Sequence, residues 1–81
     1  MRVYYVPTAD GVHNFMVAAV NQKGACERLN ISVGYFRRCG GRRLDPGSAD
    51  ARVAMSEPGR VWQQKYDYTH RSPQPWLYEG S

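Results

Sequence analysis

Four arginines near the middle of the sequence are its clearest candidates for binding a partner. Residues 35–43 contain these four and no acidic residue, whereas residues 44–59 contain three acids and one arginine. The four are Arg37, Arg38, Arg42 and Arg43. A planar guanidinium makes bidentate contacts with phosphate, carboxylate or a base edge. The net charge of +4 is therefore concentrated locally, which fits a polyanionic partner or an acidic protein surface.

Together with Tyr35, these arginines form the predicted binding site for nucleic acid or another partner. We expect Tyr35, Arg38 and Arg42 to share one face and to meet phosphates or base edges of duplex DNA, with Arg37 and Arg43 flanking them. Phosphate contacts would make the affinity salt-sensitive, and one arginine on guanine would add sequence preference. The alternative is that the arginines form a solvated face or pair with the acids that follow. Those acids are Asp45, Asp50 and Glu57.

Two short helices are expected to position the arginines. Asn21 can cap a helix over Gln22 to Leu29, and Asn30 tolerates the left-handed conformation that ends such a helix. Ser32 is a second candidate N-cap, and Gly40-Gly41 can end a helix over Val33 to Cys39. About three residues separate the two helices, so the segment has the form of a helix-turn-helix.

The remaining sequence predicts a small antiparallel sheet. Arg2 to Val6 and Phe15 to Val20 read as a hairpin with a loop of about seven residues that contains His13, and residues 60–68 alternate like a strand. Ser48 can cap a third short helix that ends before Pro58. We therefore expect an α+β fold with a sheet of about three strands, in one domain over residues 1–68. Residues 69–81 should form an extended tail, in which Trp76 packs at home or onto a neighbour.

About a third of the chain carries a family resemblance. Residues 25–46 resemble the helix-turn-helix of phage excisionases and related MerR-type winged-helix proteins. The residues that carry it are Ala25, Leu29, Ile31, Ser32, Phe36, Arg37 and Arg38, followed by Gly41-Arg42-Arg43-Leu44-Asp45-Pro46. The resemblance implies that the first helix is a support, that the second enters the major groove, and that the stretch after it leads into a β-wing.

A second similarity points to another kind of partner. The order of a hairpin, a helix, an Asn-Ile-Ser turn and a Tyr-Phe-Arg segment is also similar to small proteins of phages and mobile elements, a group that includes anti-CRISPR inhibitors. Two functions therefore stay open. One is a DNA-binding accessory protein of phage or mobile-element type, and the other is an anti-defence inhibitor that binds a host protein or nucleoprotein with an acidic surface.

Catalysis, cofactors and small-molecule substrates are not expected. A chain of 81 residues has little room for a deep cleft. The candidate metal ligands form no CxxC or HxxxH pair, and no context resembles a nucleophile motif. These ligands are His13, Cys26, Cys39 and His70. The aromatic residues could stack on unpaired bases, but we expect Trp62 and Tyr66 to lie in the core.

The distribution of apolar residues along the sequence indicates where the protein resides. No run approaches the roughly 20 apolar residues of a membrane span, and the first residues lack the apolar stretch of a signal peptide. We expect no membrane partner and a location in the cytoplasm of a bacterial host cell. In a reducing cytoplasm, Cys26 and Cys39 should be thiols rather than a disulfide.

Overall fold

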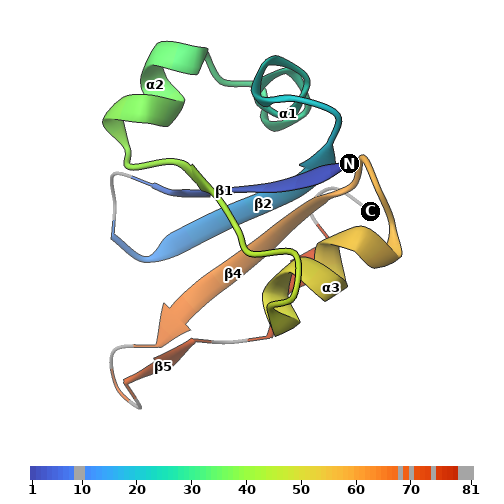
Figure 1. The fold of residues 1–81 in the computed structure, drawn as a ribbon. Coiled ribbons are helices and arrows are strands. Elements are labelled where there is room, and N and C mark those ends of the chain that lie inside the picture. Colours follow the sequence, from blue (N-terminus) through green and yellow to red (C-terminus); the bar gives the residue numbers. More distant parts are fainter. Residues whose placement is uncertain (9–10, 68, 70, 74, 79–81) are drawn as a thin grey trace.

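The protein folds around one antiparallel sheet with helices on both faces (Figure 1). The structure is a computed structural model, and it describes residues 1–8, 11–67, 69, 71–73 and 75–78. Four strands run in the order β3-β1-β2-β4, and two short strands extend the sheet beyond β4. The predicted α+β fold class is confirmed, with more strands than the three expected.

A hairpin of two long strands forms the centre of the sheet. β1 (Arg2–Pro7) and β2 (His13–Ala19) pair from Arg2 opposite Ala19 to Pro7 opposite Asn14. The loop between them is five residues long, shorter than expected, because β2 begins at His13. The expectation that His13 lies in the loop is therefore wrong. β4 (Val61–Asp67) confirms the strand that the alternating sequence predicts, and it pairs with the other edge of β2. Tyr68 lies outside the described residues.

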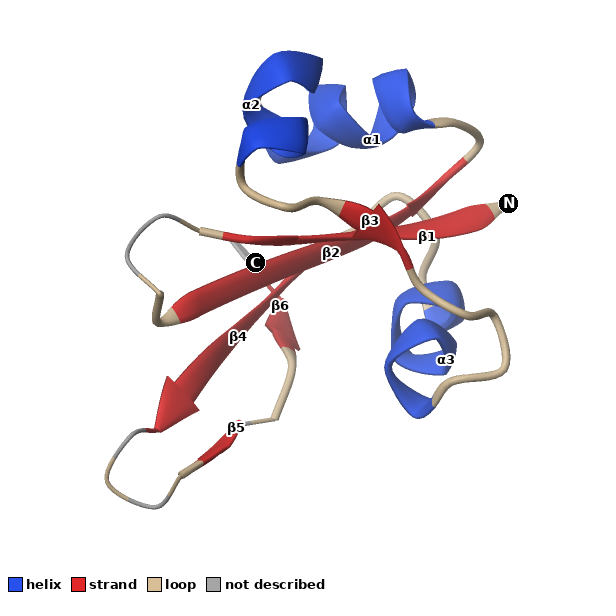
Figure 2. Cartoon of the chain, turned by 60° about the vertical axis from the view of Figure 1, so that its left-hand side comes forward, coloured by secondary structure: helices blue, strands red, loops and turns tan. Residues whose placement is uncertain are grey.

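One face of the sheet is covered by a pair of helices, α1 (Gln22–Leu29) and α2 (Val33–Arg38), and is called here the helix-pair face. Figure 2 shows both helices on the same side of β1 and β2. The buried core on this face comes from both strands and both helices. It consists of Tyr4, Val6, Val17, Ala19, Ala25, Cys26 and Phe36. Both helices match the predicted ranges to within one residue.

The opposite face carries α3 (Ala49–Ser56) and is called here the α3 face (Figure 2). Two alanines of α3, Ala51 and Ala54, are completely buried, so the helix axis can approach the sheet closely. They pack with Val3, Met16, Ala18 and Trp62. Side chains alternate along a strand, and β1 is covered on both faces, so consecutive residues of β1 belong to different cores. This is why β1 reads as a continuous apolar run.

The segment after β4 folds back onto that strand. β5 (Ser72–Pro73) pairs with Tyr66 and Asp67, and β6 (Leu77–Tyr78) pairs with Trp62 and Gln63. Two short pieces of the expected tail thus belong to the sheet, whereas Arg71 lies in a turn with a φ of 52°.

Candidate partner-binding surface

Helix α2 is built to hold three side chains outward. The Ser32 side chain caps it by accepting a hydrogen bond from the Tyr35 backbone N–H at 3.0 Å. Phe36, only 2% exposed, anchors the helix in the core of the helix-pair face and packs edge to face against Tyr4. With that side fixed, Tyr35, Arg37 and Arg38 lie on the exposed side of the helix. We call these three residues the α2 surface.

Two glycines carry the chain from α2 to the sheet. Gly40 has a φ of 80°, a left-handed conformation that favours glycine. At Gly41, an added Cβ would lie 2.6 Å from ring carbons of Phe36. The backbone therefore passes directly against the aromatic ring, and only glycine leaves room for both. The same ring anchors the helix and fixes the path of the chain that follows it.

The arginines after the glycines enter a strand. β3 (Arg42–Arg43) is a two-residue edge strand in which Arg42 lies opposite Tyr5 and Arg43 opposite Tyr4. The guanidinium of Arg42 lies over the Tyr5 ring, 5.3 Å from its centroid. Tyr5 packs with the core of the α3 face, whereas α2 covers the other face. The expectation that Tyr35, Arg38 and Arg42 share one face is therefore wrong, because strand alternation directs Arg42 to the far side of the sheet.

Nearby carboxylates do not neutralise the arginines. Within the part of the chain that the structure describes, no carboxylate forms an ion pair with any of the four. The three candidate acids have other contacts. Asp45 accepts from the Gly47 N–H at 2.8 Å, Asp50 accepts from Trp76 Nε1 at 2.9 Å, and Glu57 pairs with Arg60 at 2.6 Å. Arg37, Arg38, Arg42 and Arg43 are all exposed, and Arg42 differs from the other three by its contact with the Tyr5 ring.

The helix pair has the turn that the sequence predicts. Asn21 caps α1 by accepting from the Gly24 N–H at 2.8 Å, and Asn30 ends it with a φ of 59°. The expected β-wing does not follow. Instead of forming a separate hairpin, β3 joins the main sheet beside β1. The basic segment therefore lies on the surface of a sheet domain.

Contacts of the tail with the α3 face were not predicted from the sequence. Trp76 packs edge to face on Tyr5, with ring centroids 6.3 Å apart, and hydrogen-bonds Asp50 of α3. Arg42 also contacts Tyr5. We call the group of Tyr5, Arg42, Asp50 and Trp76 the Trp76 cluster. Burial raises the pKa of Tyr5, an effect to which Asp50 adds and which Arg42 opposes. The four are far apart in the sequence, and no local pattern links them.

The structure also places the other candidate residues. Cys26 and Cys39 are free thiols, and burial raises the pKa of Cys26. No group of three metal-ligating side chains occurs among the described residues, a set that excludes His70. Trp62 is buried as expected, and Tyr66 is half-buried. No helix of the described residues is long and apolar enough to cross a membrane.

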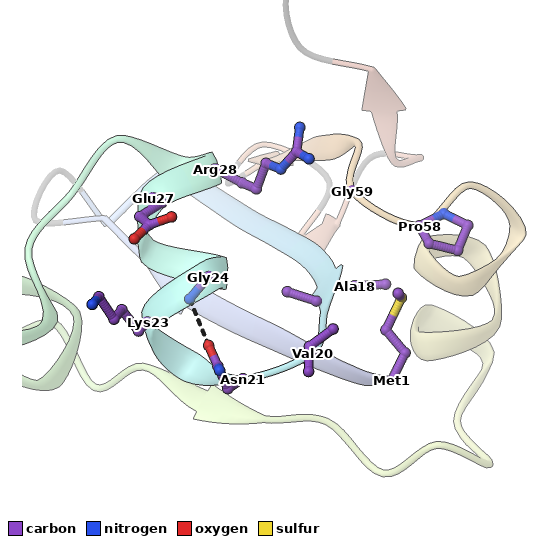
Figure 3. A pocket seen from close by; sticks show the side chains of 11 residues that line it. Met1, Ala18, Val20, Asn21, Lys23, Gly24, Glu27, Arg28, Pro58 and Gly59 are labelled. Carbon is purple, nitrogen blue, oxygen red and sulfur yellow. Dashed lines mark hydrogen bonds between the residues drawn. The ribbon is translucent and has the colours of Figure 1, made fainter.

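Two hollows lie at the end of the sheet where β1 begins and β2 ends. One, of about 520 Å³, lies between α1 and the turn before β4. Figure 3 shows it bounded by Lys23, Glu27 and Arg28 of α1 on one side and by Met1 and Pro58 on the other. The second, of about 700 Å³, lies between β3 and α3 and also includes Met1. The sequence gives no signal for either.

Comparison of the chain with protein-family models, with curated proteins and with solved structures found no match.

Proposed function

We propose that this protein is a small DNA-binding accessory protein of the phage or mobile-element type, and that it contacts duplex DNA through the α2 surface and Arg43. The observation that carries the proposal is the exposure of Arg37 and Arg38 on a capped helix without a carboxylate partner among the described residues. An unpaired, solvated guanidinium can release counterions from phosphates without first breaking an internal ion pair.

The dimensions of α2 support this mode of contact. α2 is an α-helix of six residues; a helix with its side chains is about 10–12 Å across, and the major groove of B-DNA is about 12 Å wide. The short helix therefore fits the groove, with Tyr35 and Arg38 on one side because they are three residues apart. Arg42 is not part of the proposed contact, since its guanidinium stacks on Tyr5.

A fluorescence titration against duplex DNA at two salt concentrations tests the proposal. Three phosphate contacts predict that affinity falls about 40-fold between about 50 and 200 mM salt. Replacing Arg37 and Arg38 together by Ala should remove most of this dependence. Arg52→Ala, an exposed arginine of α3 on the other face, is the matched control and should leave the dependence near that of the wild type. Absence of binding at low salt, or an affinity indifferent to salt, would overturn the proposal.

An apolar notch beside the arginines favours the second candidate, an anti-defence inhibitor that binds a protein or nucleoprotein target. The notch has a volume of about 130 Å³ and is lined by Val6, Phe15, Leu29, Ile31 and Tyr35, among others. A protein side chain can fill such a notch, whereas a phosphate gains nothing from it. Tyr and Arg are also common anchors of protein interfaces.

Capture from a bacterial lysate treated with nuclease separates the two candidates. A specific protein that remains bound after nuclease, and that is lost when Tyr35 is changed to Ala, would favour inhibition. Loss of all captured material after nuclease would favour the DNA-binding function.

A further inference from the structure

Exposed apolar side chains gather at one end of the sheet, away from the α2 surface. Met1 is 63% exposed, Val20 is 74% exposed and Met55 is 40% exposed. Met1 and Val20 line the hollow shown in Figure 3, and Met1 and Met55 line the larger hollow between β3 and α3. Because both hollows include Met1, they adjoin. Contiguous exposed apolar surface of this kind marks a contact site in soluble proteins.

The larger hollow has an apolar base and an arginine rim. Val3 and Leu44 belong to its lining and pack with the core of the α3 face. Arg52 and Met55 both line it, because they are three residues apart on the side of α3 that Ala51 and Ala54 do not bury. The hollow thus offers an apolar contact and a guanidinium side by side.

The charges around this hollow are unequal. Among the described residues, Arg2, Arg43 and Arg52 line it together with one acid, Asp45, whose side chain already accepts a hydrogen bond from Gly47. Without Arg43, which the proposed DNA contact uses, the two other arginines against one acid still leave an excess of positive charge at the rim. The adjoining hollow adds Lys23 and Arg28 against Glu27. Both hollows therefore attract a partner with negative charge.

The composition of the lining distinguishes between classes of partner. Among the described residues, no aromatic side chain lines either hollow, so this lining offers no platform on which bases of a single strand could stack. Methionine side chains are flexible and adapt to varied apolar groups, which is how promiscuous peptide-binding surfaces work. We propose that the end of the sheet formed by Met1, Arg2, Val20, Arg52 and Met55, called here the strand-end surface, binds an acidic peptide segment that inserts apolar side chains.

This proposal goes beyond DNA binding and does not depend on it. Arg2 and Arg52 of the strand-end surface take no part in the proposed DNA contact. A protein with both surfaces would hold a second, acidic protein beside its first partner. Charge complementarity would accelerate the encounter, and the apolar contacts would prolong the complex.

Selection from a displayed random peptide library tests the strand-end surface. The full chain is the bait, and the enriched peptides are measured individually for affinity. We expect them to combine Asp or Glu with Leu, Ile, Phe or Met. Reversal of both charges, Arg2→Glu with Arg52→Glu, should weaken their binding by about tenfold or more, whereas Arg37→Glu with Arg38→Glu should have little effect. Met55→Ser, at an exposed position, should weaken binding without changing the net charge.

Thermal melting of each variant confirms that it remains folded, and the Met55→Ser result applies even if the charge reversal does not fold. The proposal is overturned if no peptide is enriched, if the enriched peptides lack acidic residues, or if their affinity is unaffected by changes at Arg2, Arg52 and Met55. Competition with vesicles tests whether the strand-end surface binds lipid instead of peptide. Displacement of the peptides by phosphatidylglycerol vesicles, but not by neutral phosphatidylcholine vesicles, would overturn the peptide proposal in favour of a lipid surface.

Discussion

The two faces of the sheet use arginine in opposite ways. On the helix-pair face, Phe36 holds α2 in place, and Arg37 and Arg38 extend into solvent. On the α3 face, Arg42 stacks on Tyr5 within the Trp76 cluster. A run that is uniformly basic in the sequence is thus divided between arginines on the helix-pair face and one arginine that stacks on Tyr5 on the α3 face. The alternation of side chains along β3 produces this division.

The largest effect is expected where Phe36 is removed from the helix-pair face. Phe36→Ala should lower the free energy of unfolding by about 3–5 kcal/mol, because it deletes a buried ring and leaves a cavity. It should also abolish DNA binding, since α2 would lose its anchor. Chemical denaturation measures the first effect and titration with duplex DNA the second. If Phe36→Ala bound duplex DNA as the wild type does, Phe36 would not be what holds α2 and its arginines in place.

A smaller effect is expected at the exit of α2. Gly41→Ala places a methyl group 2.6 Å from the Phe36 ring, and such overpacking costs about 1–3 kcal/mol. Gly40→Ala is the matched control. An added Cβ there meets nothing within 4 Å, although the φ of 80° remains unfavourable. Thermal unfolding of both variants should rank Gly41→Ala as the less stable, and the reverse order would mean that backbone conformation outweighs the contact with Phe36.

On the α3 face, the predicted effect is smaller again. Trp76→Phe keeps an aromatic ring against Tyr5 but removes the hydrogen bond to Asp50. The loss should be about 1 kcal/mol, the usual net contribution of such a bond. Hydrogen exchange should accelerate at Leu77 while the amides of α2 are unaffected. Equal acceleration in α2 would show that the two faces are coupled.

The smallest predicted effect is on the pH dependence of stability, to which each face contributes one group: Cys26 on the helix-pair face and Tyr5 on the α3 face. Burial raises the pKa of Cys26 above its ordinary value of 9.0 and that of Tyr5 above 10.0. The folded state therefore retains protons that the unfolded state releases, so these two groups leave stability unchanged well below pH 9 and lower it as pH rises above 9. Cys26→Ala should flatten the decline that begins near pH 9, and Tyr5→Phe only the decline that begins near pH 10. Denaturation curves across this range measure both, and stability that rose with pH would contradict the assignment.

Local signals predict all three helices. Asn21, Ser32 and Ser48 each cap the helix that they precede in the sequence, because a cap depends on residues three or four positions apart. The contacts of the Trp76 cluster on the α3 face could not be predicted in this way. Trp76 contacts Asp50 and Tyr5 only when the strands are paired, since Trp76 lies 26 positions after Asp50 and 71 positions after Tyr5 in the sequence.

The error over Arg42 has the same origin. The sequence shows that a helix ends at two glycines, but it does not show that the next two residues pair with β1. Because Arg42 lies opposite Tyr5 in a strand, the direction of its side chain follows strand alternation. The helical spacing from Tyr35 and Arg38 therefore does not predict which face it shares.

The most direct test of the division compares the salt dependence of duplex DNA binding in two variants. Changing both Arg37 and Arg38 to Ala should reduce the slope of log affinity against log salt by about 2, since each phosphate contact contributes about 0.9. Arg42→Ala should leave the slope unchanged and lower stability by about 0.5–1 kcal/mol, through loss of the contact with Tyr5. A slope that falls as much per residue for Arg42 as for Arg37 and Arg38 would contradict the account.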